Sequence, residues 1–337
     1  MNPIEGDLIQ DSNGIIFDVK GLVHPFDRII AFPRFIPDSS GNRKHEDQTY
    51  KKVYNLSARF KFLEGNFPSY LIYDPVFDET LCEVPATAVK RRYKPVQKLW
   101  DLRTCRNLGE LGRTALMLME SLKKTADVPW RALGISGSLL VGLQTPKSDI
   151  DPVVYGSENC CKVHAALKSI VKDDNSRFRP YTQGDLRKLF EFRSKDTHMS
   201  FENFVKTEAR KVLQGKFMEK DYFIRFVKDW AEMDEKYGEI RYKNCGYAKI
   251  RATVEDDSES IFTPCRYKVK NVTIIEGPKP QPILEIASFR GRFCEQARKD
   301  EVVITQGKIE HVMDSKRGLE YFRILLGNKP SDYMALA

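Results

Sequence analysis

The sequence lacks any long apolar run. No stretch approaches the roughly 18 consecutive apolar residues that a membrane-spanning helix needs. The first residues, MNPIEGDLIQDSNG, are polar and acidic, without the basic and then apolar order of a secretory signal. Both features predict a protein that has no membrane partner and is cytoplasmic.

Cysteine and histidine are sparse and scattered. The chain has seven cysteines and five histidines, with no Cys-x-x-Cys spacing and one adjacent pair, Cys160 and Cys161. The histidines stand apart from the cysteines and from each other. This usage predicts reduced, mostly buried thiols and argues against a Cys/His metal site.

The sequence also shows no internal repeat and no low-complexity segment. Its 337 residues, 41% hydrophobic and 30% charged, are typical of an ordinary globular protein with two or three domains. What stands out is a net charge of +8. Excess positive charge favours polyanionic partners, nucleic acids among them.

Sequence patterns predict an α+β, multi-domain protein. Two β-branched and aromatic runs in residues 14–36 flank the turn HPFD and predict a hairpin. The basic stretch KRRYKPVQK contains a proline and predicts a linker. Residues after 239 alternate as in a small barrel or sandwich. We therefore expect a β-rich or α+β N-terminal domain (1–100), a central domain of mixed sheet and helices (101–235) and a β-rich C-terminal domain (236–337).

Helices and one strand are predicted within the central domain. Ser200 is a candidate N-cap, and Gly215 stands where a helix would stop. YFIRFVK reads as a strand. The expected helices span residues 103–125, a segment from Ser157 onward, roughly 184–195 and 200–214.

The most informative stretch is LGISGSLLVGLQTPKSDIDPVVYG, residues 133–156. On a strand, Asp149 and Asp151 point to one face while Ile150 points to the core. Two neighbouring carboxylates repel each other unless water or a divalent cation separates them, and Mg²⁺ is a hard cation that prefers such oxygens. Pro152 predicts an edge strand or a bulge, because proline cannot donate to a ladder.

Gly137 and Ser138 complement this acid pair. RALGIS predicts a strand, Gly137 a turn and SLLVGL a short helix, whose first N–H groups and the Ser138 hydroxyl would bind phosphate. Glycine lets the backbone approach the ligand closely. Lys147, in the loop before Asp149, could neutralise phosphate charge. A solvated strand edge and an ordinary turn explain either half alone; the joint pattern favours metal-assisted phosphoryl transfer.

The spacing Gly137-Ser138, ten residues, Asp149-Ile150-Asp151 resembles the signature of the DNA polymerase β-like nucleotidyltransferase superfamily. Ser148 and Gly142 match it too. The resemblance is specific over residues 131–156 and looser to about residue 230; more widely the chain is similar to a group of archaeal predicted nucleotidyltransferases. It implies a nucleotidyltransferase palm in which the Gly-Ser turn holds a nucleoside triphosphate (NTP) and the aspartates hold two Mg²⁺ ions. The implied reaction moves a nucleoside monophosphate from the NTP to an acceptor hydroxyl.

The chain departs from this signature at the third carboxylate that the superfamily carries on a later strand. The centre of the expected strand is Arg225, which would meet a phosphate or pair with a carboxylate. An alternative function follows: a nucleotide- or RNA-binding protein that keeps the fold with weakened catalysis. Candidates for the missing acid, each better explained as an exposed turn residue, are Asp221, Asp229, Glu255, Asp256 and Asp257.

Charge favours RNA as the acceptor. Residues 176–230 have an excess of Lys and Arg interleaved with aromatics, which suits RNA, although helical spacing also explains those aromatics as core. The aromatics are Phe178, Tyr181, Phe190, Phe192, Phe201 and Phe204. A second basic cluster, equally explained as a surface loop, is Arg290, Arg292, Arg298 and Lys299.

Overall fold

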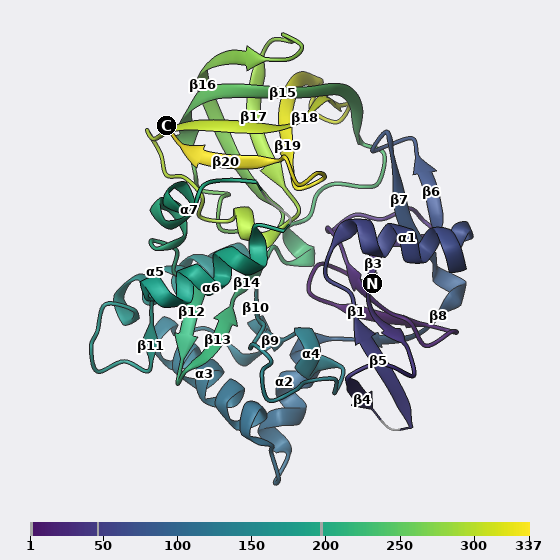
Figure 1. Cartoon of the computed structure of the whole chain (residues 1–337), viewed down its shortest axis with the longest axis vertical. Coiled ribbons are helices and arrows are strands. Elements are labelled where there is room, and N and C mark those ends of the chain that lie inside the picture. Colours follow the sequence, from purple (N-terminus) through teal and green to yellow (C-terminus); the bar gives the residue numbers. More distant parts are fainter. Residues whose placement is uncertain (1–2, 46, 196–197) are drawn as a thin grey trace. The chain divides into compact units, whose positions relative to one another are not determined.

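The computed structural model describes residues 3–45, 47–195 and 198–337 (Figure 1). It is a mixed α+β structure whose contacts divide it into two compact units. The first unit is residues 1–72, 81–179 and 212–234, and the second is residues 73–80, 180–211 and 235–337. These units do not follow the boundaries of the three domains expected from the sequence, which stay a prediction.

An eight-stranded sheet forms the N-terminal part of the chain. Its order is β4-β5-β3-β2-β1-β8, with β7 added to β3 and β6 added to β7. The predicted hairpin is present, since β2 pairs with β3 through Asp18 opposite Phe32 and Val19 opposite Ala31. The strands are β1 (Leu8–Asp11), β2 (Ile16–Val19), β3 (Arg28–Pro37), β4 (Arg43–His45), β5 (Gln48–Lys52), β6 (Leu71–Asp74), β7 (Glu79–Pro85) and β8 (Val89–Tyr93).

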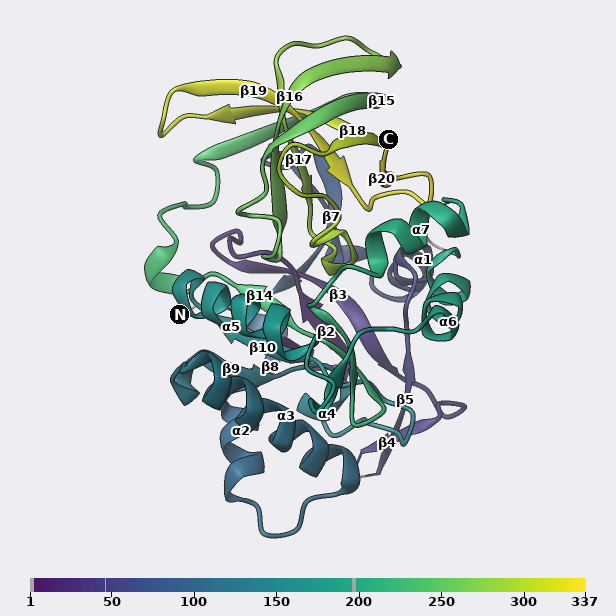
Figure 2. The ribbon, with the colours of Figure 1, turned by 90° about the vertical axis from the view of Figure 1, so that its left-hand side faces the viewer.

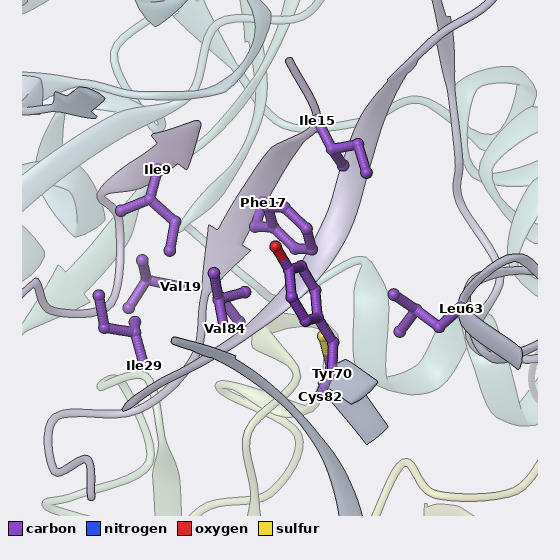
Figure 3. Close-up of a cluster of buried hydrophobic side chains, with 10 residues drawn as sticks. Ile9, Ile15, Phe17, Val19, Ile29, Leu63, Tyr70, Cys82 and Val84 are labelled. Atoms are coloured by element: carbon purple, nitrogen blue, oxygen red, sulfur yellow. The ribbon is translucent and has the colours of Figure 1, made fainter. Parts of the chain in front are cut away.

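One core of this sheet gathers apolar side chains beneath helix α1 (Leu56–Asn66). Phe17 and Tyr70 pack at its centre, with Leu63 from the helix beside them (Figure 3). The predicted linker KRRYKPVQK is wrong. Its first half is strand β8, which pairs with β1, and its second half begins helix α2 (Pro95–Thr104).

A small sheet in the first unit holds the sequence motif. Strand β10 (Pro152–Tyr155) is its central strand, antiparallel to β9 (Leu133–Ile135) and parallel to β14 (Arg225–Val227). The expected edge or bulge at Pro152 is therefore wrong; proline is tolerated as the first residue of the strand. Helix α5 (Ser157–Ile170) packs against β10 and β14 (Figure 2). The other helices here are α3 (Glu110–Ala126) and the short α4 (Gly137–Leu140).

The predicted strand YFIRFVK is broken at Ile224. Its first part belongs to β13 (Lys220–Phe223), which pairs with β12 (Gln214–Phe217), and its second part is β14. Strand β11 (Phe178–Arg179) completes the sheet of β12 and β13. Gly215 lies within β12 and stops no helix, because α7 (Phe201–Glu208) already ends at Glu208. A Cβ at Gly215 would lie 2.6 Å from the Arg179 carbonyl oxygen, which explains the glycine.

The second unit combines two helices with a closed sheet. Thr182 caps α6 (Gln183–Arg193), and Ser200 caps α7, as predicted for Ser200. The strand order β15-β16-β17-β19-β18, with a further pairing of β18 to β15, closes a small barrel, and β20 adds to β18. The strands are β15 (Ile240–Asp256), β16 (Cys265–Glu276), β17 (Ile283–Ser288), β18 (Val302–Asp314), β19 (Leu319–Leu326) and β20 (Tyr333–Leu336).

Among the helices that the structure describes, none is both long enough and apolar enough to span a membrane.

Candidate functional site

The acid pair lies at the entry to strand β10. Ile150 is fully buried and bonds on both sides to β13: its N–H donates to the Asp221 carbonyl at 2.9 Å, and its own carbonyl accepts from Phe223 N–H at 3.1 Å. This extended pairing turns Ile150 to the core and Asp149 and Asp151, both half-buried, to the opposite face. The two carboxylates therefore share a face, as the alternation predicts.

The two carboxylates repel each other. Burial and the charge of Asp149 together raise the pKa of Asp151 to about 6, although Lys52 and Arg34 act against this shift. Over the described part of the chain, neither carboxylate has a hydrogen bond or an ion pair. Such an uncompensated pair is a place where a bound cation would lower the energy of both anions.

Gly137 lies directly against Asp151. Its φ is +65°, in the left-handed region that favours glycine, and a Cβ there would overlap Asp151 Oδ2. A hydrogen bond holds the Gly137 turn to the segment of Asp149 and Asp151, because Ser136 N–H donates to the Asp151 carbonyl at 2.8 Å. Strand β9, the glycine turn and α4 are thus the predicted strand, turn and short helix, and they put the turn beside the acid pair.

The Ser138 hydroxyl is buried and makes no hydrogen bond to the described residues. The residue is 1% exposed, and its Oγ has no hydrogen-bond partner among the described residues. A buried hydroxyl without a partner is costly. A phosphate oxygen at the glycine turn would satisfy it.

Lys147 and Ser148 have different places. Ser148 is buried and closes its own loop, because its Oγ accepts from Thr145 N–H at 2.9 Å and lies 3.5 Å from Arg43 Nη1. Lys147 is exposed on that loop, without an ion pair to any residue that the structure describes. Ser148 therefore shapes the approach to Asp149, and Lys147 is free to meet a ligand.

Arg225 pairs with carboxylates. It stands opposite Val153 in the parallel pairing of β14 with β10. Its Nη1 lies 3.0 Å from Glu5 Oε1 and 3.6 Å from Asp18 Oδ1. Arg225 and Glu5 form an ion pair but no hydrogen bond, because Arg225 Nη1 has no hydrogen-bond partner among the described residues. Burial opposes ionisation of Asp18, but Lys20 and Arg225 outweigh it and hold the pKa of Asp18 well below its usual range.

Two further cations near the site, Arg34 and Lys52, are not predicted by the sequence. Both act electrostatically on Asp151, and both lie over the Tyr54 ring, at 5.5 Å and 4.8 Å from its centroid. Arg34 is the extra residue where the β2–β3 register shifts between Phe17–Pro33 and Ile16–Phe35 pairs. A bulge of this kind redirects a side chain, so strand alternation gives no signal for it.

Among the described residues, no third acid joins the pair. Asp221 is next to Asp149 in register, but its carboxylate oxygen Oδ2 pairs with Lys216 Nζ at 3.0 Å. Asp229 caps a short 3₁₀ turn by accepting from Trp230 N–H at 2.6 Å, and Asp256, in the second unit, pairs with Lys268 at 3.2 Å. Within residues 3–45, 47–195 and 198–337, no group of three His, Cys, Asp or Glu is placed to hold a metal ion. Glu255 is exposed on strand β15, and Asp257 is half-buried directly after that strand.

The aromatic side chains of residues 176–230 are largely core, as their helical spacing predicts. Phe178 packs on Phe217 with ring centroids 4.7 Å apart, and Phe190 packs on Phe201 and Phe204, at 5.3 Å each. Phe192 is exposed and Tyr181 half-buried. Of the second basic cluster, Arg298 and Lys299 are exposed, whereas Arg290 and Arg292 are half-buried.

Comparison with known proteins gives a relative over nearly the whole chain. The uncharacterized protein MJ1086 of Methanocaldococcus jannaschii is 33% identical over 333 residues, which cover 95% of this chain and 94% of the relative. No family model matches the sequence. No solved structure matches it either.

Proposed function

The chain belongs to the same family as MJ1086 of Methanocaldococcus jannaschii, and we propose that it is a Mg²⁺-dependent nucleotidyltransferase. The observation that carries this proposal is the packing of the Gly137 turn against the carboxylate of Asp151. It joins a phosphate-binding turn to a pair of metal ligands. In the proposed reaction the acceptor oxygen bonds to the α-phosphorus, the bond to pyrophosphate breaks, and the acceptor proton passes to solvent.

The donor set fits a magnesium ion. Asp149 and Asp151 supply hard carboxylate oxygens on one face, and Mg²⁺ commonly takes one or two carboxylates together with phosphate oxygens and water. When bound, it would supply positive charge next to the reacting phosphate. The raised pKa of Asp151 and the absence of a protein partner for either carboxylate among the described residues support this assignment.

The chain's own residues would bind and orient the triphosphate. Gly137 leaves room for close approach of a phosphate, and the buried Ser138 hydroxyl can donate to it. Arg34 and Lys52, both near Asp151, carry charge complementary to the β- and γ-phosphates. Lys147 is exposed on the loop that leads to Asp149 and can add to this charge.

We favour RNA as the acceptor. The net charge of +8 suits a polyanion. The barrel order β15-β16-β17-β19-β18, closed by β18 on β15, with only β17 and β19 parallel within that ring, is that of the oligonucleotide-binding barrel. The likeness to the oligonucleotide-binding barrel is one of fold, and one fold serves many functions.

Arg225 favours a second candidate. A cation stands where the signature has an acid, so the protein would bind an NTP or RNA without turnover. Both candidates require the same nucleotide site and differ only in chemistry.

Transfer of label from α-phosphate-labelled NTPs tests the proposal. With Mg²⁺ and a mixture of RNAs including tRNA, the wild type should label an acceptor, and the Asp149→Asn/Asp151→Asn variant should not. Asp174→Asn, an exposed acid in the same unit, is the matched control and should keep activity. Nucleotide binding without transfer would establish the second candidate, and no nucleotide binding would refute both.

A further inference from the structure

The face that carries the acid pair also carries Arg225. Ile150 pairs with Tyr222, and Val153 pairs with Arg225. Both pairings are parallel and have the same offset in the sequence, so the register does not change between them. Asp151 and Arg225 therefore point to the same side of the sheet. Arg225 and Asp151 also interact electrostatically, and the negative charges of Glu5, Asp18 and Asp151 raise the pKa of Arg225 against the effect of its burial.

The chain's own cations already neutralise the other two carboxylates near this face. Glu5 is fully buried; Lys20 Nζ lies 3.1 Å from its Oε1, and Gly21 N–H donates to its Oε2 at 2.8 Å. Asp18 Oδ2 is 2.8 Å from the same Lys20 Nζ. With Arg225 Nη1 at 3.0 Å from Glu5 and 3.6 Å from Asp18, two acids face two bases. Neither acid is available as a metal ligand.

Of the four acids described near this face, Asp149 and Asp151 are the two without a cation partner and can bind a metal. Two metal ions in one phosphoryl-transfer site lie roughly 3.5–4 Å apart, and each needs its own oxygen ligands. A guanidinium on the same face, which interacts electrostatically with Asp151, opposes the binding of a second divalent ion. Arginine stays protonated at every working pH, so this charge is permanent.

We propose that Arg225 is a built-in cation that replaces one of the two ions, so that the nucleotide site takes a single divalent ion. This inference rests on the proposed function, because it assumes that Asp149 and Asp151 bind a metal with an NTP. It makes Arg225 a positioning residue that fixes the metal count.

The number of bound Mn²⁺ ions tests the proposal without turnover. Mn²⁺ is titrated into the full-length protein with an α,β-methylene NTP analogue, and bound ions are counted by electron paramagnetic resonance. We expect one ion per chain in the wild type and in Arg225→Lys, and two in Arg225→Glu. Two ions in the wild type would overturn the inference and leave the proposed function intact; none would overturn both.

Two further variants keep the test decisive if Arg225→Glu does not fold. Asp18→Asn should still bind one ion, since Asp18 is neutralised by Lys20 and Arg225; loss of the ion would overturn the inference. Arg179→Glu is the matched control, because Arg179 also pairs with a carboxylate, Glu219 at 2.8 Å, in an exposed place. It should bind one ion, and a second ion there would show that any added acid raises the count, which contradicts the role of Arg225.

Discussion

Gly137 is the residue on which the geometry of the site depends. Its positive φ and its contact with Asp151 Oδ2 leave no place for a Cβ. We expect Gly137→Ala to displace the Asp151 carboxylate and to weaken Mg²⁺–NTP binding at least about tenfold. The backbone strain should also cost about 1–2 kcal/mol of folding stability. Isothermal titration calorimetry and chemical denaturation measure the two effects.

Gly65 provides the control for this substitution. It lies in helix α1, and a Cβ there would meet nothing within 4 Å. Gly65→Ala should leave binding unchanged and slightly stabilise the protein, because alanine favours the helix. Equal binding by wild type and Gly137→Ala would show that the turn does not shape the nucleotide site.

The raised pKa of Asp151 gives a pH dependence with a defined sign. Its folded value of about 6 lies above the usual value for aspartate, so the folded protein binds this proton more tightly than the unfolded chain. The metal needs the carboxylate, so Mg²⁺–NTP binding should weaken about tenfold for each pH unit below 6. Calorimetric titrations from pH 5 to pH 8 would reveal this; binding that is flat below pH 6 would contradict it.

The same shift predicts a stability gain. Without metal, Asp151 destabilises the folded state increasingly as the pH rises from about 4 through 6. Asp151→Asn should therefore stabilise the metal-free protein at pH 7 by roughly 1–3 kcal/mol and change little at pH 4. Denaturation at both pH values measures the difference. A loss of stability at pH 7 would mean that the carboxylate has a partner that holds the fold together.

At this scale the sequence predicted the parts of the site that are close in the chain. The spacing of Gly137, Ser138, Asp149 and Asp151 was enough to expect a turn beside an acid pair. Arg34 and Lys52 could not be predicted, because their approach to Asp151 depends on a register shift between strands far from the motif. Arg225 was identified, but its pairing with Glu5 and Asp18 depends on tertiary contacts that no local pattern reports.

Among the elements, a row of charges crosses three strands of the barrel. Arg323 on β19 stands opposite Glu310 on β18 and beside Glu285 on β17, with its Nε 2.8 Å from Glu310 Oε2. The Arg323 side chain is 4% exposed. Removing it breaks the ion pair with the buried Glu285 and leaves Glu310 with Lys308, at 2.9 Å, as its ion-pair partner, so Arg323→Ala should cost about 3–5 kcal/mol in a denaturation experiment.

Arg317 is the matched control for the buried pair. Its side chain is 65% exposed and pairs with Asp314 at 3.2 Å. Arg317→Ala should cost at most about 1 kcal/mol, because water screens the exposed guanidinium and the backbone N–H of residue 317 still donates to the buried Asp314 carboxylate. Similar losses for the two variants would show that the charge row contributes no more than a surface ion pair.

The elements that local signals define agree with their predictions, and those that tertiary pairing defines do not. Ser200 caps α7 and the strand, turn and short helix around Gly137 are present, since each depends on neighbours in the chain. KRRY became strand β8 because β1 is there to pair with it, and YFIRFVK split because its halves pair with different sheets. Hydrophobic pattern alone does not report pairing partners.

For the whole molecule, charge sets the expected binding to RNA. A protein with net charge +8 that contacts several phosphates releases counterions, so its affinity falls steeply with salt. We expect binding to a short single-stranded RNA to weaken by at least about tenfold between 50 and 200 mM salt, measured by fluorescence anisotropy. No binding at low salt would remove RNA as the acceptor and leave nucleotide transfer to another hydroxyl.

The sequence did not predict which segments of the chain belong to which compact unit. Residues 180–211 join the second unit although they lie in the chain between β11 and β12 of the first unit, and Lys211 shows why. Its Nζ is buried between Glu208 Oε1 at 2.6 Å and Gln296 Oε1 at 2.8 Å. Such long-range contacts leave no trace in composition or periodicity. The mixed α+β class and the β-rich C-terminal part, by contrast, follow from local patterns, whereas alternation left a barrel and a sandwich as alternatives.

We expect Asp149, Asp151 and the Gly137 turn to bind a metal–nucleotide complex. Calorimetric titration of Mg²⁺–ATP and of the other three NTPs into wild type and into Asp149→Asn/Asp151→Asn tests it most directly. The wild type should bind at least one NTP in a magnesium-dependent manner, and the variant should bind none. Equal affinity of the two proteins, or no binding to the wild type, would contradict it.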